Sequence, residues 1–161
     1  MSRTVWRIAT DTPAYQADDL SGAGAKASGG RWNPAGFPLV YASTTRALAC
    51  LETIVHLNAG GLPLNRYLVA VTIPDNIWAR ARSETDASLK IGWDALPAGQ
   101  VSIDLGAGWL RTAASALLVI PSVIVPEEFN VLINPGHPDA VQITAAKVRR
   151  WLYDDRLTKA A

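Results

Sequence analysis

The chain has 161 residues, of which 49% are hydrophobic and 18% are charged. This length allows one substantial hydrophobic core but is too short for two ordinary domains, so we expect one compact domain spanning residues 1–161. Fifteen basic and fourteen acidic side chains give a formal net charge of +1. So small a charge provides no long-range attraction to polyanions, and we expect no direct nucleic-acid partner and no membrane partner.

The cysteine content and the N-terminus indicate a reducing cytoplasmic location. The one cysteine, Cys50, cannot form an intramolecular disulfide and has no neighbour at a metal-ligand spacing, so we expect no bound metal. The opening segment reaches an acidic residue before any apolar run of signal-peptide length. No stretch approaches the roughly 20 apolar residues that span a bilayer.

The first third of the chain alternates between short apolar segments and a long glycine-rich one. Residues 4–9 are rich in β-formers and predict a strand. Residues 18–36 carry glycine or another small residue at most positions, which predicts a long shaped loop. Residues 39–42 then predict a buried strand.

A helix is expected from the hydroxyl residues 43–45 to about residue 58. Its apolar residues Leu48, Leu51 and Val55 recur at helical spacing and predict a buried stripe. Glu52 lies at the margin of that stripe. A carboxylate in such a place either satisfies a buried polar network or holds charge for a reaction, and the residue type alone leaves both readings open.

The remaining elements are predicted less uniformly. Residues 67–73 and 130–133 predict strands, residues 109–117 a helix, and residues 117–126 strand-like pieces bracketed by prolines. Residues 147–153 fit a helix and a strand equally well. Because strands and helices follow one another irregularly, the fold class is expected to be α+β and not a regular βαβ stack.

Four further features could carry chemistry. In the segment Gly29-Gly30-Arg31-Trp32-Asn33, two glycines before an arginine would let backbone amides and a guanidinium approach one phosphate or pyrophosphate closely, although Arg31 could equally pair with a surface acid. The segment lacks the spacing of a Walker loop or a dinucleotide fingerprint. Tyr41 could stack on a flat ring or belong to the core. Ser122 lies in no sequence motif of a catalytic nucleophile, which favours a role in a positioning hydrogen bond. His56 lies one helical turn after Glu52, within reach of a hydrogen bond to it.

Taken together, four segments resemble the RES domain, a family named for an arginine, a glutamate and a serine. They are SGAGAKASGGRWNPAGFPLVYAS, ALACLETIVHL, PSVIV followed by EEFNVLINPGHP, and YDDRL. The three eponymous residues match Arg31, Glu52 and Ser122, and the resemblance runs from about residue 6 to residue 157. YDDRL lacks the proline that many relatives have between aspartate and arginine.

The resemblance implies a fold similar to that of ADP-ribosyltransferases, with two packed β-sheets, flanking helices and a cleft for NAD, in a single RES domain. It also implies the toxin of a bacterial type II toxin–antitoxin system, whose partner is an Xre-like antitoxin that blocks the active site. Such toxins use NAD as substrate and need no metal. They either pass ADP-ribose to a protein acceptor, such as an enzyme of nucleotide biosynthesis, or deplete NAD as a glycohydrolase or phosphorylase.

The residue analysis and the resemblance give one expected mechanism. Glu52 stabilises positive charge on the ribose as nicotinamide leaves. Arg31 holds the pyrophosphate, Tyr41 packs against the nicotinamide ring, and Ser122 fixes the cleft by hydrogen bonding. Gly30 and Trp32 complete the expected NAD-binding set. We favour transfer to a protein over NAD hydrolysis or phosphorolysis; the alternative from another class is a non-catalytic nucleotide-binding module.

Overall fold

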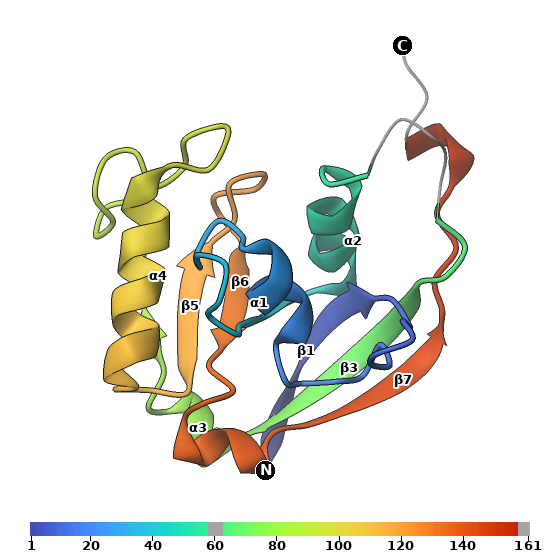
Figure 1. Cartoon of the computed structure of the whole chain (residues 1–161), viewed down its shortest axis with the longest axis horizontal. Coiled ribbons are helices and arrows are strands. Elements are labelled where there is room, and N and C mark those ends of the chain that lie inside the picture. Colours follow the sequence, from blue (N-terminus) through green and yellow to red (C-terminus); the bar gives the residue numbers. More distant parts are fainter. Residues whose placement is uncertain (58–62, 158–161) are drawn as a thin grey trace.

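The computed structural model describes residues 1–57 and 63–157. It contains seven strands, four α-helices and two short 3-10 helices (Figure 1). In chain order they are β1 (Ser2–Ala9), α1 (Ala23–Ser28), β2 (Val40–Ser43), α2 (Arg46–Ile54), β3 (Tyr67–Pro74), α3 (Asp75–Trp78), β4 (Arg82–Ser83), α4 (Gln100–Thr112), β5 (Leu117–Pro121), β6 (Phe129–Ile133), Pro138–Gln142, β7 (Thr144–Arg150) and Asp155–Leu157. The mixture confirms the expected α+β class.

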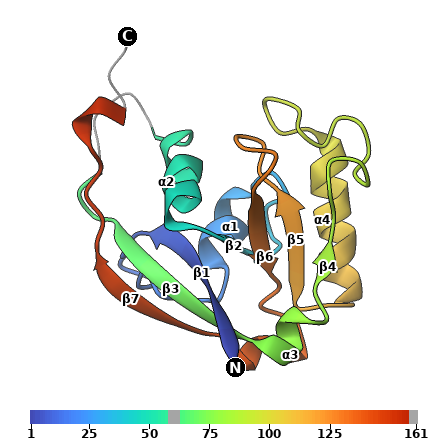
Figure 2. The same ribbon diagram turned by 180° about the vertical axis from the view of Figure 1, so that it is seen from behind.

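The strands form one sheet of order β4-β5-β6-β2-β1-β3-β7. β1 pairs with β3 along its whole length, and β2 pairs with β6 along all of its four residues. Between these halves, β1 and β2 share a single register pair, Trp6 with Ser43. The resemblance implies two packed sheets; the structure has one sheet whose halves join at this narrow point and diverge on either side of it (Figures 1 and 2).

Two large hydrophobic clusters support the sheet, and the larger one contains residues of both halves, from β3 as well as from β6. The strand β3 alternates buried and partly buried residues, and its Val69, Val71 and Ile73 are fully buried in the larger cluster. On the other half, α4 runs alongside β5 in both views and contributes Trp109 to a second cluster with Leu118 and Leu132 (Figures 1 and 2). The helix α2 packs against β1 and β2, close to the point where the halves join.

The helix α2 begins as its sequence predicts but presents a different face to the sheet. The side-chain oxygen of Thr45 accepts a hydrogen bond from the backbone N–H of Leu48, which caps the first turn. The expected stripe is wrong, because Leu51 is 36% and Val55 58% exposed. Leu48 and Ala49 are the buried residues, and Glu52 follows them on the same face of the helix.

Four other expectations need correction. The helix α1 interrupts the loop expected at 18–36, because Gly22 adopts a left-handed conformation immediately before it. The helix α2 ends at Ile54, earlier than expected, and residue 58 lies outside the described residues. The helix expected at 109–117 spans 100–112 and stops at Ala113, which has a positive φ. The segment 122–126 contains no strand, whereas the ambiguous segment 147–153 begins within β7.

None of the described helices has both the length and the apolar character that crossing a membrane requires.

Candidate active site

A pocket of about 1100 Å³ opens where the two halves of the sheet join. Its wall comes from β1, α1, β2 and α2 and from residues 96–98, 120–121 and 123–124. The volume is at the upper end of the range for small-molecule sites. Arg31, Tyr41 and Glu52, which the sequence singles out, all line it, together with Gly30 and Trp32.

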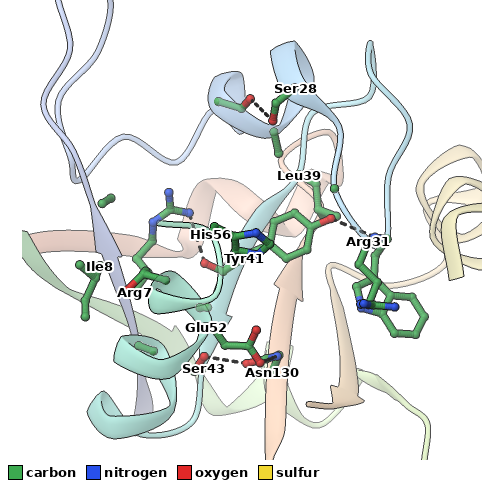
Figure 3. A pocket seen from close by; sticks show the side chains of 18 of the residues that line it. Arg7, Ile8, Ser28, Arg31, Leu39, Tyr41, Ser43, Glu52, His56 and Asn130 are labelled. Carbon is green, nitrogen blue, oxygen red and sulfur yellow. Dashed lines mark hydrogen bonds between the residues drawn. The ribbon is translucent and has the colours of Figure 1, made fainter. Parts of the chain in front are cut away.

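Glu52 projects from α2 into this pocket, where two side chains hold one of its oxygens. Ser122 donates a hydrogen bond to Oε1 from its Oγ at 2.7 Å, and Asn130 donates another from Nδ2, also at 2.7 Å. No described residue hydrogen-bonds Oε2. The carboxylate is therefore oriented through one oxygen and keeps the other for a ligand (Figure 3). No hydrogen bond joins Glu52 to His56 among the described residues, although His56 also lines the pocket.

Ser122 and Asn130 are themselves fixed by the fold. Ser122 is fully buried, and its Oγ accepts hydrogen bonds from the backbone N–H groups of Ile124 and Val125. Asn130 is the register partner of Ser43 across β2 and β6, and the Ser43 hydroxyl donates to its Oδ1 at 2.6 Å. Ser122 is absent from the wall of the pocket, so the structure places it behind Glu52.

Tyr41 is anchored by the glycine-rich segment. Its hydroxyl donates to Asn33 Oδ1 at 2.6 Å and accepts from the backbone N–H of Trp32 at 3.1 Å. Burial raises the pKa of this phenol above its ordinary value, so it stays neutral. At Gly30, a Cβ would lie 2.6 Å from the tyrosine oxygen. This close approach explains the glycine at position 30.

Trp32 contributes mainly through its position. Its side chain is only 2% exposed and stacks on Trp93, with ring centroids 6.1 Å apart. Its carbonyl faces α4 so closely that a Cβ at Gly106 would lie 1.7 Å from the carbonyl oxygen. The contact fixes the backbone next to Arg31.

The Arg31 guanidinium is held by one nitrogen. Its Nη1 donates to the carbonyl oxygens of Trp93 at 3.1 Å and Ala95 at 2.8 Å. Burial lowers the pKa of Arg31, and the nearby negative charge of Glu52 acts in the opposite direction. Arg31 forms no ion pair with a described residue. Its remaining N–H groups can bind an anion.

A second guanidinium, that of Arg7 on β1, was missed by the sequence analysis. Its Nη1 donates to the carbonyl oxygen of Tyr41 at 3.4 Å, and its buried Nε has no hydrogen-bond partner among the described residues. Burial lowers the pKa of Arg7 as well. Figure 3 shows Arg7 and Arg31 on opposite sides of Tyr41. An arginine inside the apolar run of β1 was the available signal.

Asn130 and Ser43 were also missed as site residues. Asn130 lies inside the segment EEFNVLINPGHP, but only the register of β2 against β6 reveals its contact with Ser43. Within residues 1–57 and 63–157, no three His, Cys, Asp or Glu side chains gather as metal ligands.

Comparisons with known proteins agree with the resemblance. The family model described as "RES domain" matches residues 4–155. A Sphingobium protein named "Prs ADP-ribosylating toxin" is 61% identical over 161 residues, covering 100% of both chains. Two proteins named "Toxin Res" are 37% identical: that of Photorhabdus laumondii over 91% of this chain and 92% of its own, and that of Pseudomonas putida over 95% and 98%. The chain belongs to the RES domain family.

Proposed function

We propose that this chain is the toxin of a bacterial type II toxin–antitoxin pair, which cleaves NAD at the nicotinamide–ribose bond and transfers ADP-ribose to a protein acceptor in the cytoplasm. The observation that carries the proposal is the fixed carboxylate of Glu52 in a large pocket that is also lined by the guanidinium groups of Arg7, Arg31 and Arg66. In this proposal residues 1–161 form one RES domain, and the two halves of the sheet flank an NAD cleft as in ADP-ribosyltransferases.

The chemistry follows from charge. When the bond between the ribose C1′ and the nicotinamide nitrogen breaks, its electron pair leaves with nicotinamide, and the ribose gains oxocarbenium character. Oε2 of Glu52 accepts a hydrogen bond from a ribose hydroxyl and faces the developing positive charge. Because Ser122 and Asn130 already orient the carboxylate, little reorganisation is needed in the transition state.

The other residues bind and orient the substrate. Arg7 and Arg31 supply N–H donors for the pyrophosphate, whose charge they neutralise. Tyr41 presents its half-buried ring to the nicotinamide, and its anchored hydroxyl keeps the ring in place. Ser122 acts through Glu52, and Gly30 and Trp32 shape the wall. The nucleophile of the acceptor then attacks C1′ and loses its proton.

The name of the Sphingobium relative supports transfer over hydrolysis. We propose that the acceptor is the protein that this name calls Prs, and that an Xre-like antitoxin inhibits the chain by covering the pocket. Cys50 and Leu51 precede Glu52. Arginine-directed transferases often have an acidic residue or glutamine there, so an arginine acceptor has no support.

Mass spectrometry of the purified chain with NAD, first alone and then with purified Prs, tests the proposal. We expect free nicotinamide in equal amount to the ADP-ribose mass added to Prs. Nicotinamide release with only free ADP-ribose, or with its phosphate, would instead establish an NAD glycohydrolase or phosphorylase. No release in either mixture would leave a non-catalytic nucleotide-binding module.

A further inference from the structure

The pocket has two separate charged ends. Arg31 interacts electrostatically with Glu52, Asp94 and Tyr41. Arg7 also contacts Tyr41, through a hydrogen bond to its backbone carbonyl, but the titratable side chains that act on Arg7 are Asp19 and Tyr15, which are not among those that act on Arg31. Figure 3 shows the two arginines on opposite sides of Tyr41. Asp19 and Tyr15 line the pocket together with Arg7, so the end near Arg7 belongs to the same cavity as Glu52.

Asp19 is the carboxylate at the end near Arg7, and it is held in place. Its Oδ2 accepts hydrogen bonds from the backbone N–H of Ser21 at 3.1 Å and from the Ser21 hydroxyl. No described residue hydrogen-bonds its Oδ1. Asp19 and Arg7 form no ion pair within hydrogen-bonding reach. Each group therefore keeps hydrogen-bonding capacity for a ligand.

NAD contains two riboses joined by a pyrophosphate, and the two ends of the pocket match that arrangement. The proposed function places the nicotinamide ribose at Glu52 and the pyrophosphate against the guanidinium groups. The adenosine ribose then reaches the end that contains Arg7 and Asp19. Resting on that proposed function, we infer that Asp19 accepts a hydrogen bond from the 2′-hydroxyl of the adenosine ribose and selects NAD against NADP.

The selection follows from charge. NADP carries a phosphate where NAD has the 2′-hydroxyl, and this phosphate adds up to two negative charges beside the carboxylate. A carboxylate at hydrogen-bonding distance accepts from a hydroxyl but repels a phosphate. Without the charge of Asp19, the cations Arg7 and Arg66, which both line the pocket, would attract the phosphate instead.

The test compares kcat/KM for nicotinamide release from NAD and from NADP. The variants are Asp19→Asn, which keeps an oxygen for the contacts with Ser21, and Asp18→Asn, a matched control outside the pocket wall. We expect the wild type and the control to prefer NAD strongly. In Asp19→Asn the ratio of NAD to NADP should fall about tenfold or more, mainly because NADP improves. Activity of Asp19→Asn with NAD reports that the variant is folded.

Each outcome decides the inference. A fall of the ratio in Asp19→Asn alone supports it. An unchanged ratio with active enzyme overturns it and leaves the proposed function standing, as does a wild type that already cleaves NADP as well as NAD. A wild type that releases no nicotinamide from NAD overturns the proposed function and this inference together. Calorimetric titration of Asp19→Asn with NADP provides the second readout: tighter binding than wild type supports the inference, and equal binding contradicts it.

Discussion

The hydroxyl of Ser122 donates a hydrogen bond to Oε1 of Glu52 at 2.7 Å, although the two residues are 70 positions apart in the sequence. The serine is fully buried, whereas the glutamate reaches the pocket. The arginine, glutamate and serine for which the family is named thus have different relations to the cavity. The serine holds the glutamate, and the glutamate is left to face the ligand.

Ser122→Ala is expected to lower turnover about tenfold, because Glu52 loses one of its two orienting donors. Stability should fall by about 1–3 kcal/mol, since the N–H groups of Ile124 and Val125 lose their acceptor. Steady-state nicotinamide release and urea unfolding measure the two effects. Ser102→Ala, at another fully buried serine, is the control and should change stability without changing turnover. Equal turnover in wild type and Ser122→Ala would contradict the orienting role.

Glu52→Gln removes the charge and nearly keeps the shape. If the carboxylate acts on the transition state, turnover should fall by roughly 10²–10³-fold while the NAD dissociation constant changes by less than about threefold. Calorimetry measures binding, and nicotinamide release measures turnover. Normal turnover in this variant would show that Glu52 does not stabilise the oxocarbenium charge.

Arg31→Ala, unlike Glu52→Gln, should weaken the binding of NAD. Loss of a charged donor to the pyrophosphate is expected to raise the NAD dissociation constant about tenfold or more. Arg149→Ala, which removes an exposed arginine outside the pocket wall, is the control and should leave the constant unchanged. An unchanged constant in Arg31→Ala, with the fold intact by circular dichroism, would remove Arg31 from the binding role.

Sequence patterns predict the regular strands well and the glycine-containing segments poorly. Residues 4–9, 67–73 and 130–133 form strands because β-branched and apolar residues pack on a half-buried sheet. The helix α4 was only partly predicted, since Gly106 and Gly108 lower helix propensity within it. Its tertiary contact with Trp32 requires the first of these glycines, and no local pattern reveals that contact.

The site residues likewise fall into those that the sequence predicts and those that only the structure reveals. Arg31, Tyr41 and Glu52 lie in recognisable segments, and the structure brings them to one pocket. The roles of Asn130 and Arg7 depend on strand register and on which side chain lacks a partner in the fold. Neither property can be read from residue spacing.

Two glycines in α4 allow a matched comparison. A Cβ at Gly106 would lie 1.7 Å from the Trp32 carbonyl oxygen, so Gly106→Ala should displace the segment that carries Arg31 and cost about 1–3 kcal/mol of unfolding free energy. A Cβ at Gly108 meets nothing within 4 Å, so Gly108→Ala should stabilise the helix by about 0.5–1 kcal/mol. Urea unfolding measures both. Similar effects of the two substitutions would show that helix propensity, and not the contact with Trp32, requires glycine at position 106.

The ion pair between Asp11 and Lys147, at 2.8 Å, joins β7 to the segment leading to Tyr15 and Asp19. The hydrogen bond from Lys147 lowers the pKa of Asp11, assisted by the N–H of Ala17, and the hydrogen bond to Asp11 raises the pKa of Lys147.

The pKa of Asp11 is lower in the folded state than in the unfolded state. Its contribution to folding stability is therefore fully present at pH values above the unfolded-state pKa of about 4, and it is lost as the pH falls through the folded-state pKa. The pKa of Lys147 is higher in the folded state. Its contribution to folding stability is therefore fully present below the unfolded-state pKa of about 10.4, and it is lost as the pH rises through the folded-state pKa. Asp11→Asn, which can still accept from Ala17, should therefore be less stable than wild type between about pH 5 and 9. The difference should shrink at both extremes. Urea unfolding of both proteins at several pH values tests the pair. If wild type and Asp11→Asn differ in unfolding free energy by the same amount at about pH 3 and about pH 7, the charge of Asp11 contributes nothing to stability.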